Sequence, residues 1–198
     1  MASPIVAITG ASGSVYGVRL VQLLVEQGAQ PTVLVSDAGR LVMKVELGTD
    51  RLSDLVGSSG YHVDSVANLA APIASGSYQT SGMVIVPCSM GTAAAIAHGI
   101  SSNLIHRAAD VTLKERRRLI LVPREAPMHA GHLQTLLTLA NLGALILPAM
   151  PAFYHRPATI DDLVDSVVAR ILDHLQIDHP VIRRWGQVPG EVPLDDRL

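Results

Sequence analysis

The sequence predicts an α/β fold, a three-layer doubly wound parallel sheet, on the strength of three observations. Short apolar runs rich in β-branched residues recur along the chain, segments with helical periodicity lie between them, and glycine or proline often separates the two. Strands that alternate with helices pair in parallel through right-handed crossovers. Helices then cover both faces of the sheet, which is why its strands are apolar throughout.

The expected elements alternate from the N-terminus onward. Five apolar runs fit buried strands: "PIVAIT" at 4–9, "TVLVS" at 32–36, "MVIVPCS" at 83–89, "LILVP" at 119–123 and "ALILP" at 144–148. Helical patterns occupy about 16–27, 38–47, 90–98, 103–116, 129–141 and 160–175. Segment 58–82 is rich in serine, glycine and alanine, and the tail 176–198 is rich in proline. Both fit loops or arms rather than core.

The last of these helices has the clearest start signal. Thr159 is a suitable N-cap, and Asp161 and Asp162 complement the positive end of the helix dipole. Apolar residues then recur at helical spacing as far as Leu172. We therefore expect a well-defined amphipathic helix at 160–175.

Length and composition predict one domain in an oligomer. We expect residues 1–198 to form a single domain with 176–198 as a C-terminal arm, because a chain of 198 residues can bury a large core. Apolar residues make up 48% of the chain and charged residues 16%, so we expect other subunits to cover part of the surface.

Charge, hydropathy and cysteine content narrow the class of protein. A net charge of −2 without a basic stripe argues against a nucleic-acid partner. No apolar run reaches the roughly 20 residues of a membrane span. "MASPIVAIT" lacks the basic start of a signal peptide, and the single cysteine, Cys88, fits a reducing compartment. We expect a cytoplasmic protein.

The first strand leads into a glycine turn, "ITGASGSVYG" at 8–17. Backbone N–H groups and a helix N-terminus favour an anion there, although a tight connection that binds nothing stays open. The spacing of Gly10, Gly13 and Gly17 matches neither common dinucleotide fingerprint. Asp37 ends the second strand and favours NAD, but no tyrosine has the lysine four residues later that a short-chain dehydrogenase needs.

Other strand ends also carry polar residues. In "PCSMGT", Ser89 and Thr92 fit either a second anion or flavin site or an ordinary N-cap. "VPREAP" places Arg124 and Glu125 at a carboxyl end, where ligands bind in such sheets. Cys88 fits a small buried residue better than a nucleophile.

Two histidines are considered as metal ligands. His129 and His132 are three residues apart, but no matching third ligand is evident. We therefore expect no metal site.

Six segments, read in order, resemble the flavin prenyltransferase (UbiX) family. They are "TGASGSVYGVRL", "PCSMGT", "NLIHRAADVTLKERRRLILVPREAP", "NLGALILP", "PAFYHRP" and "IRRWGQ", and the match covers about residues 4–187. The resemblance implies a Rossmann-like or flavodoxin-like flavoprotein that forms a dodecamer. It also implies a metal-independent transfer of a dimethylallyl group from dimethylallyl phosphate to N5 and C6 of reduced FMN. The product, prenylated FMN, would pass to a UbiD-type decarboxylase.

The resemblance also assigns roles to residues. It implies FMN contacts at Gly10, Ala11, Ser12, Ser36, Ser89, Met90, Gly91, Thr92 and Arg124. It implies substrate contacts at Tyr154 and Arg170, and further active-site positions at Ser12, Glu46, Lys114, Glu125 and Trp185.

These residue types suit the implied chemistry. Lys114, Arg170 and the Tyr154 hydroxyl can stabilise a departing phosphate. Trp185 offers a π face to an allyl cation. Ser12, Glu46 and Glu125 can relay protons, and which of them is the base stays open.

Lys114 and Trp185 lie on surface-like segments. We therefore expect neighbouring subunits to complete the site.

Competing functions are weaker. A phosphopantothenoylcysteine decarboxylase carries a P-A-M-N motif, whereas residues 148–151 read "PAMP", and the one cysteine follows a strand instead of lying in a flap. A non-catalytic flavin carrier would not need Lys114, Glu125, Tyr154 and Arg170 together. An NAD oxidoreductase is a distant third. Whether the donor is the monophosphate or the diphosphate stays open.

Overall fold

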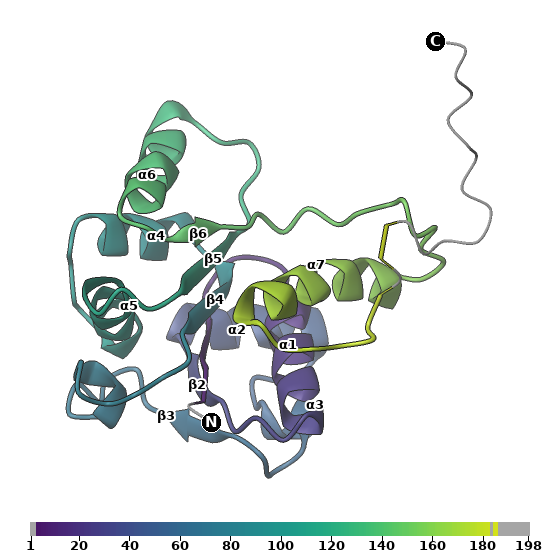
Figure 1. The fold of residues 1–198 in the computed structure, drawn as a ribbon, viewed down its shortest axis with the longest axis horizontal. Helices are drawn as coiled ribbons and strands as arrows, with labels where there is room; N and C mark the ends of the chain where they lie inside the picture. Colours follow the sequence, from purple (N-terminus) through teal and green to yellow (C-terminus); the bar gives the residue numbers. More distant parts are fainter. Residues whose placement is uncertain (1–2, 183, 186–198) are drawn as a thin grey trace. The chain divides into compact units, whose positions relative to one another are not determined.

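A computed structural model describes residues 3–182 and 184–185 (Figure 1). The described strands form one all-parallel sheet in the order β3-β2-β1-β4-β5-β6. Their bounds are β1 Ile5–Ile8, β2 Thr32–Val35, β3 His62–Asp64, β4 Met83–Cys88, β5 Leu119–Pro123 and β6 Leu145–Ile146. The predicted fold class is confirmed.

The helices begin and end within two residues of the predicted positions. Their bounds are α1 Ser14–Glu26, α2 Asp37–Leu47, α4 Met90–Ala97, α5 Leu104–Lys114, α6 Ala130–Asn141 and α7 Ile160–Leu175. A short helix, α3 Ser53–Val56, was not predicted. In the part of the chain that the structure describes, no helix combines the length and the apolar character of a membrane span.

Residues divide between two compact units, Met1–Ala149 and Met150–Leu198. The first holds the whole sheet, and the second holds α7. The expectation of a single domain stays a prediction. Of the expected arm at 176–198, residues 183 and 186–198 lie outside the described residues.

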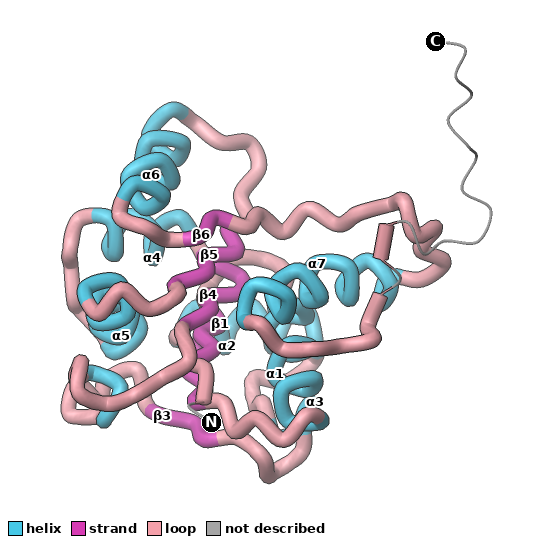
Figure 2. Tube along the Cα trace, in the orientation of Figure 1, coloured by secondary structure: helices cyan, strands magenta, loops and turns pink. Residues whose placement is uncertain are grey.

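Helices of the first unit cover both faces of the sheet. Figure 1 places α4, α5 and α6 on one side and α1 and α2 on the other, and Figure 2 shows β1, β4 and β5 between α5 and α1. Alternate residues of a strand point to opposite faces. Accordingly, Ala7 joins a buried cluster with Ala108 of α5, whereas Ile8 contacts α1 beside Gly17. Strands buried on both faces explain the unbroken apolar runs.

The segment predicted to be loop contains two regular elements. β3 is a three-residue edge strand in which His62 pairs with Thr32 and both His62 and Val63 are exposed. A 3-10 helix follows at Pro72–Ala74, where Ile73 is buried in the core. The loop prediction for 58–82 was therefore wrong at these positions, because an exposed edge strand needs no apolar run and only its pairing with β2 defines it.

The second unit confirms the predicted start of α7. Thr159 Oγ1 accepts a hydrogen bond from the Asp162 amide at 3.1 Å, and Asp162 Oδ2 accepts one from the Thr159 amide at 2.9 Å. This reciprocal pair is a capping box. It satisfies two amides that a helix start would otherwise leave unpaired.

Gly17 allows α1 to approach the sheet closely. A Cβ there would lie 2.4 Å from the Val86 carbonyl oxygen and 2.7 Å from Ile8 Cγ1. We expect Gly17→Ala to lower the free energy of unfolding by about 1–3 kcal/mol through overpacking. Denaturant unfolding at one protein concentration would measure this change.

Gly91 is the matched control for that experiment. It is also helical, but a Cβ there would meet nothing within 4 Å. Gly91→Ala should leave stability unchanged or raise it, because alanine favours the helix. Equal destabilisation by both variants would contradict the close-approach argument.

Candidate functional site at the carboxyl edge of the sheet

The candidate site lies where the strand order reverses, between β1 and β4. Ligands bind outside the carboxyl ends of the strands at such a switch point. Thr9 joins the two strand ends, since its hydroxyl donates to the Pro87 carbonyl oxygen at 2.7 Å and accepts from the Ser89 amide at 2.8 Å. This side chain holds the turn after β1 beside the turn after β4.

The turn after β1 is occupied by a carboxylate of the chain itself. Gly13 ends the turn with a φ of 104°, and its amide donates to both oxygens of Glu46 at 3.0 and 3.1 Å. The Ser14 amide donates to Glu46 Oε2 at 2.8 Å. Glu46 thus neutralises the positive end of α1, which has no acidic residue in its own first turn.

These contacts set the charge of Glu46. Burial alone would raise its pKa, but hydrogen bonds from the Ser12 side chain and from the backbone of Ser14 and Gly13 hold the pKa of this carboxyl below its ordinary value. Glu46 is therefore ionised at neutral pH. The structure brings it together with Ser12, and the roles assigned to both residues stay predictions.

The start of α2 packs against the same turn. A Cβ on Gly10 would lie 2.6 Å from Ala38 Cβ, so only glycine allows this approach. Ser36 caps α2 by accepting from the Gly39 amide at 3.0 Å, and its own amide donates to the Ile8 carbonyl oxygen. Gly10, Ala11, Ser12 and Ser36 are therefore neighbours at this edge.

The turn after β4 serves as a helix cap. Ser89 Oγ accepts from the Thr92 amide at 3.3 Å and donates to Thr92 Oγ1 at 3.0 Å. Of the two interpretations left open for Ser89, capping is confirmed, and ligand binding stays a prediction. Met90 is buried in the core, so its side chain faces away from a ligand. Gly91 leaves open space beside its Cα.

Arg124 and Glu125 continue the edge beyond β5. The Arg124 amide donates to the Cys88 carbonyl oxygen at 3.4 Å. Arg124 lies close enough to Tyr16 that its charge offsets part of the burial that raises the pKa of the Tyr16 hydroxyl. Glu125 Oε1 accepts from the Ala126 amide at 3.1 Å. A cation and a carboxylate thus flank the two turns.

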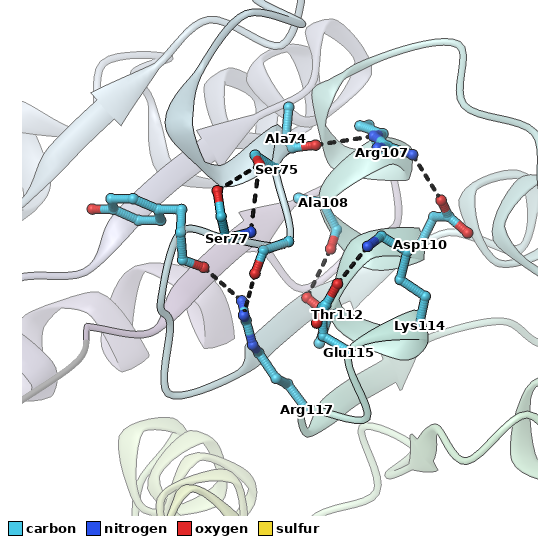
Figure 3. Close-up of polar contacts among 12 residues, drawn as sticks. Ala74, Ser75, Ser77, Arg107, Ala108, Asp110, Thr112, Lys114, Glu115 and Arg117 are labelled. Carbon is cyan, nitrogen blue, oxygen red and sulfur yellow. Dashed lines mark hydrogen bonds and ion pairs between the residues drawn. The ribbon is translucent and has the colours of Figure 1, made fainter.

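Lys114 is not brought to this edge within one chain. It ends α5 in an ion pair with Glu115, beside Arg117, whose guanidinium donates to the carbonyl oxygens of Gly76 and Tyr78 (Figure 3). The backbone carbonyl oxygen of Arg118 accepts a hydrogen bond from the Met83 amide at the start of β4. The five residues of β5 place Lys114 about 16 Å or more from the carboxyl edge.

Three predicted site residues belong to the second unit. The Trp185 ring lies edge-on to the Tyr154 ring, with centroids 5.4 Å apart. Arg170 Nη1 donates to Asp173 Oδ2 at 2.7 Å. These residues come from a loop, a helix and the segment after it, and the ring contact brings Tyr154 and Trp185 together.

Cys88 and His129 have structural roles. Cys88 is fully buried, and burial raises the pKa of its thiol to about 12, so it is not a thiolate at neutral pH. His129 Nδ1 accepts from the Gly131 and His132 amides and caps α6. Among the residues that the structure describes, no three His, Cys, Asp or Glu side chains gather as metal ligands do.

Thr9 is the residue that the sequence-based assignment missed. Its bridge between β1 and β4 joins residues 78 positions apart. A hydroxyl directly after a buried strand, in front of a glycine turn, was the available signal. Without the strand order, nothing in the sequence indicates which loop it contacts.

Comparison with known proteins identifies the family of the chain. The Flavoprotein family model matches residues 3–172. The chain belongs to the Flavoprotein family. It is 50% identical over 92% of its length to a flavin prenyltransferase UbiX of Alkalihalophilus pseudofirmus, covering 95% of that protein. It is 48% identical over 91% of its length to the UbiX of Pseudomonas aeruginosa, covering 92% of that protein. The resemblance to the flavin prenyltransferases is confirmed.

Solved flavoprotein structures show the same fold. AnUbiX (PadA1), described in complex with FMN and dimethylallyl pyrophosphate, is 39% identical with a TM-score of 0.86, and the match covers 93% of this chain and 97% of that one. A dodecameric FMN-dependent UbiX-like decarboxylase from Escherichia coli O157:H7 is 41% identical with a TM-score of 0.85, covering 92% and 98%. A phosphopantothenoylcysteine (PPC) decarboxylase mutant is 20% identical with a TM-score of 0.58, which shows a shared fold alone.

The contact between Glu46 and α1 predicts a pH-dependent stability difference. The folded pKa of Glu46 is lowered from an ordinary value of 4.5, so its stabilisation is present above 4.5 and is lost as the pH falls through the folded pKa. The melting temperature of Glu46→Gln should therefore be lower than that of wild type at pH 7, and this difference should vanish at acidic pH. Thermal unfolding from pH 3 to 7 would measure it. A difference that is constant with pH would contradict a role for the charge.

Proposed function

We propose that this flavoprotein joins a dimethylallyl group from dimethylallyl phosphate to N5 and C6 of reduced FMN. The observation that carries the proposal is the relative with bound FMN and dimethylallyl pyrophosphate, which matches 93% of the chain at 39% identity. Curated relatives at 50% and 48% identity are flavin prenyltransferases. The product, prenylated FMN, would serve a UbiD-type decarboxylase.

The donor groups at the carboxyl edge suit a flavin mononucleotide. Turn amides at 10–12 and the Thr92 hydroxyl can donate to phosphate or ring carbonyl oxygens, and Arg124 supplies a positive charge. The open space beside Gly91 allows a planar ring to approach the backbone. These residues would hold FMN, and the buried Met90 would contribute only its amide.

The chemistry requires a leaving phosphate and three proton transfers. The allylic carbon–oxygen bond breaks, phosphate leaves with the electron pair, and reduced FMN supplies N5 and C6, which each lose a proton while one proton returns to the allylic double bond. Arg170, Lys114 and the Tyr154 hydroxyl would donate hydrogen bonds to the phosphate. Trp185 would face the cationic allyl group with its π system.

Contacts around the two carboxylates favour Glu125 as the proton acceptor. Glu46 already accepts from Gly13 and Ser14 and from the Ser12 side chain, which occupies most of its acceptor sites. Those bonds also lower its basicity. Glu125 accepts a hydrogen bond through Oε1, from the Ala126 amide at 3.1 Å. We assign the anchoring of Ser12 to Glu46 and proton removal to Glu125.

The position of Lys114 supports a site shared between subunits. A lysine at the amino edge of the sheet reaches a carboxyl-edge site only if that site belongs to a neighbouring chain. A dodecameric relative at 41% identity and the exposure of Leu41 and Val45 on α2 and Leu133 and Leu137 on α6 support a homo-oligomer. We propose a dodecamer.

Mass spectrometry of the extracted flavin tests the proposed activity. Anaerobic incubation of the purified protein with reduced FMN and dimethylallyl phosphate should yield FMN with one added C5H8 unit, and omission of the allylic phosphate should yield none. A parallel incubation with the diphosphate distinguishes the two donors. Unmodified FMN from protein that binds it, with both donors, would favour a flavin carrier or a decarboxylase instead.

Mixed oligomers test the shared site. Lys114→Ala and Arg124→Ala should each abolish prenylation alone, because each removes one half of every site. Co-refolded or co-expressed subunits in equal amounts should recover about a quarter of wild-type activity, since random pairing leaves that share of sites intact. Mixtures that stay inactive, at the same oligomeric state by light scattering, would place both residues in one subunit's site.

A further inference from the structure

We infer that Asp173 is a positioning residue that orients Arg170 toward the substrate phosphate and anchors the segment carrying Trp185. The inference rests on the proposed function, which assigns the phosphate to Arg170. It concerns only the second unit of the chain. Asp173 lies one helical turn after Arg170 on α7, and 18% of its side chain is exposed.

Both oxygens of the Asp173 carboxylate are used. Oδ2 accepts from Arg170 Nη1 at 2.7 Å. Oδ1 accepts from Arg184 Nη2 at 2.8 Å and from His179 Nε2 at 3.2 Å. One carboxylate therefore joins α7 to two side chains that follow it. Oδ2 contacts Arg170 within the helix, and Oδ1 contacts the two residues beyond it.

The buried His179 ring completes a cluster of side chains around Asp173, together with Arg170 and Arg184. Its side chain is 1% exposed, and its Nδ1 accepts from the Val181 amide at 3.4 Å. Because Nδ1 accepts, the ring proton of the neutral form is on Nε2 and is donated to Asp173. The chain reverses direction between these partners at Gln176, which has a φ of 59°. His179 thus holds the returning segment against Asp173.

The negative charge of Asp173 fixes the direction of the Arg170 side chain. Burial would raise the pKa of Asp173, but the hydrogen bond and charge of Arg184 and the hydrogen bond of His179 hold the pKa of this carboxyl below its ordinary value. The ionised carboxylate accepts one N–H of Arg170, whose side chain is 55% exposed. A guanidinium fixed at one edge by a carboxylate presents its other N–H groups in a set direction, which suits a phosphate.

The same carboxylate acts on the aromatic pair through Arg184. Arg184 directly precedes Trp185, whose ring meets the Tyr154 ring edge-on at 5.4 Å and 77°. The attraction of Asp173 for Arg184 therefore holds the backbone from which Trp185 reaches Tyr154. Three predicted substrate-handling side chains, Tyr154, Arg170 and Trp185, depend on this one group, which the family resemblance did not single out.

Asp173→Asn tests the inference with little change in size. The amide keeps an acceptor but loses the charge, so the Michaelis constant for dimethylallyl phosphate should rise about tenfold while the affinity for FMN stays near wild type. Asp161→Asn is the matched control, because Asp161 is an exposed carboxylate of the same helix with no part in the cluster. The control should keep the wild-type Michaelis constant.

A double-mutant cycle separates positioning from a general loss of structure. Arg170→Ala should itself raise the Michaelis constant, and Asp173→Asn should raise that constant almost no further in that background, because its effect on phosphate binding passes through Arg170. If Arg170→Ala leaves the constant unchanged, the assignment of the phosphate to Arg170 in the proposed function fails. If Arg170→Ala raises it and Asp173→Asn alone does not, the positioning of Arg170 by Asp173 is overturned.

Fluorescence tests the anchoring without any substrate. Trp185 is the only tryptophan of the chain, so the emission reports that residue alone. Asp173→Asn should increase the fast component of the time-resolved anisotropy decay, and Asp161→Asn should not. An unchanged decay in Asp173→Asn would overturn the anchoring, whatever the protein's activity proves to be.

Discussion

The bridge that Thr9 makes between β1 and β4 is the contact on which the candidate site depends. The strand order reverses at these two strands, so the loops after them diverge over opposite faces of the sheet. One hydroxyl, donating to Pro87 and accepting from Ser89, keeps the first residues of both loops together. The glycine turn and the Ser89 turn form one edge for that reason.

Part of the positive charge at this edge of the sheet is neutralised by the chain's own Glu46. The positive end of α1 would attract any anion. Glu46 from α2 accepts hydrogen bonds from the Gly13 and Ser14 amides at this end. These bonds do not use the amides of residues 10–12, where FMN binding is proposed, and they place a negative charge beside Ser12. The same contact ties α2 to α1, so the turn is held from both sides, by Ala38 next to Gly10 and by Glu46 next to Gly13.

The cations assigned to FMN and to the allylic phosphate come from three different parts of the chain. Arg124 lies at the carboxyl edge, Lys114 lies at the amino edge in an ion pair with Glu115, and Arg170 lies in the second unit in an ion pair with Asp173. Each of the last two has a carboxylate partner that limits its motion. A site that needs all three must draw on more than one chain, which links the proposed oligomer to the proposed chemistry.

The sequence by itself determined the succession of strands and helices along the chain, apart from β3 and α3, together with the cap at Thr159 and the family. Periodicity, capping and motifs are local, and each lies within a few neighbouring residues. Only the tertiary structure decided the strand β3, the contact of Glu46 with α1, the displacement of Lys114 to the opposite edge, and the Asp173 cluster. These depend on strand order and chain reversal, which join residues up to 80 positions apart, and no pattern within a short window specifies such pairs.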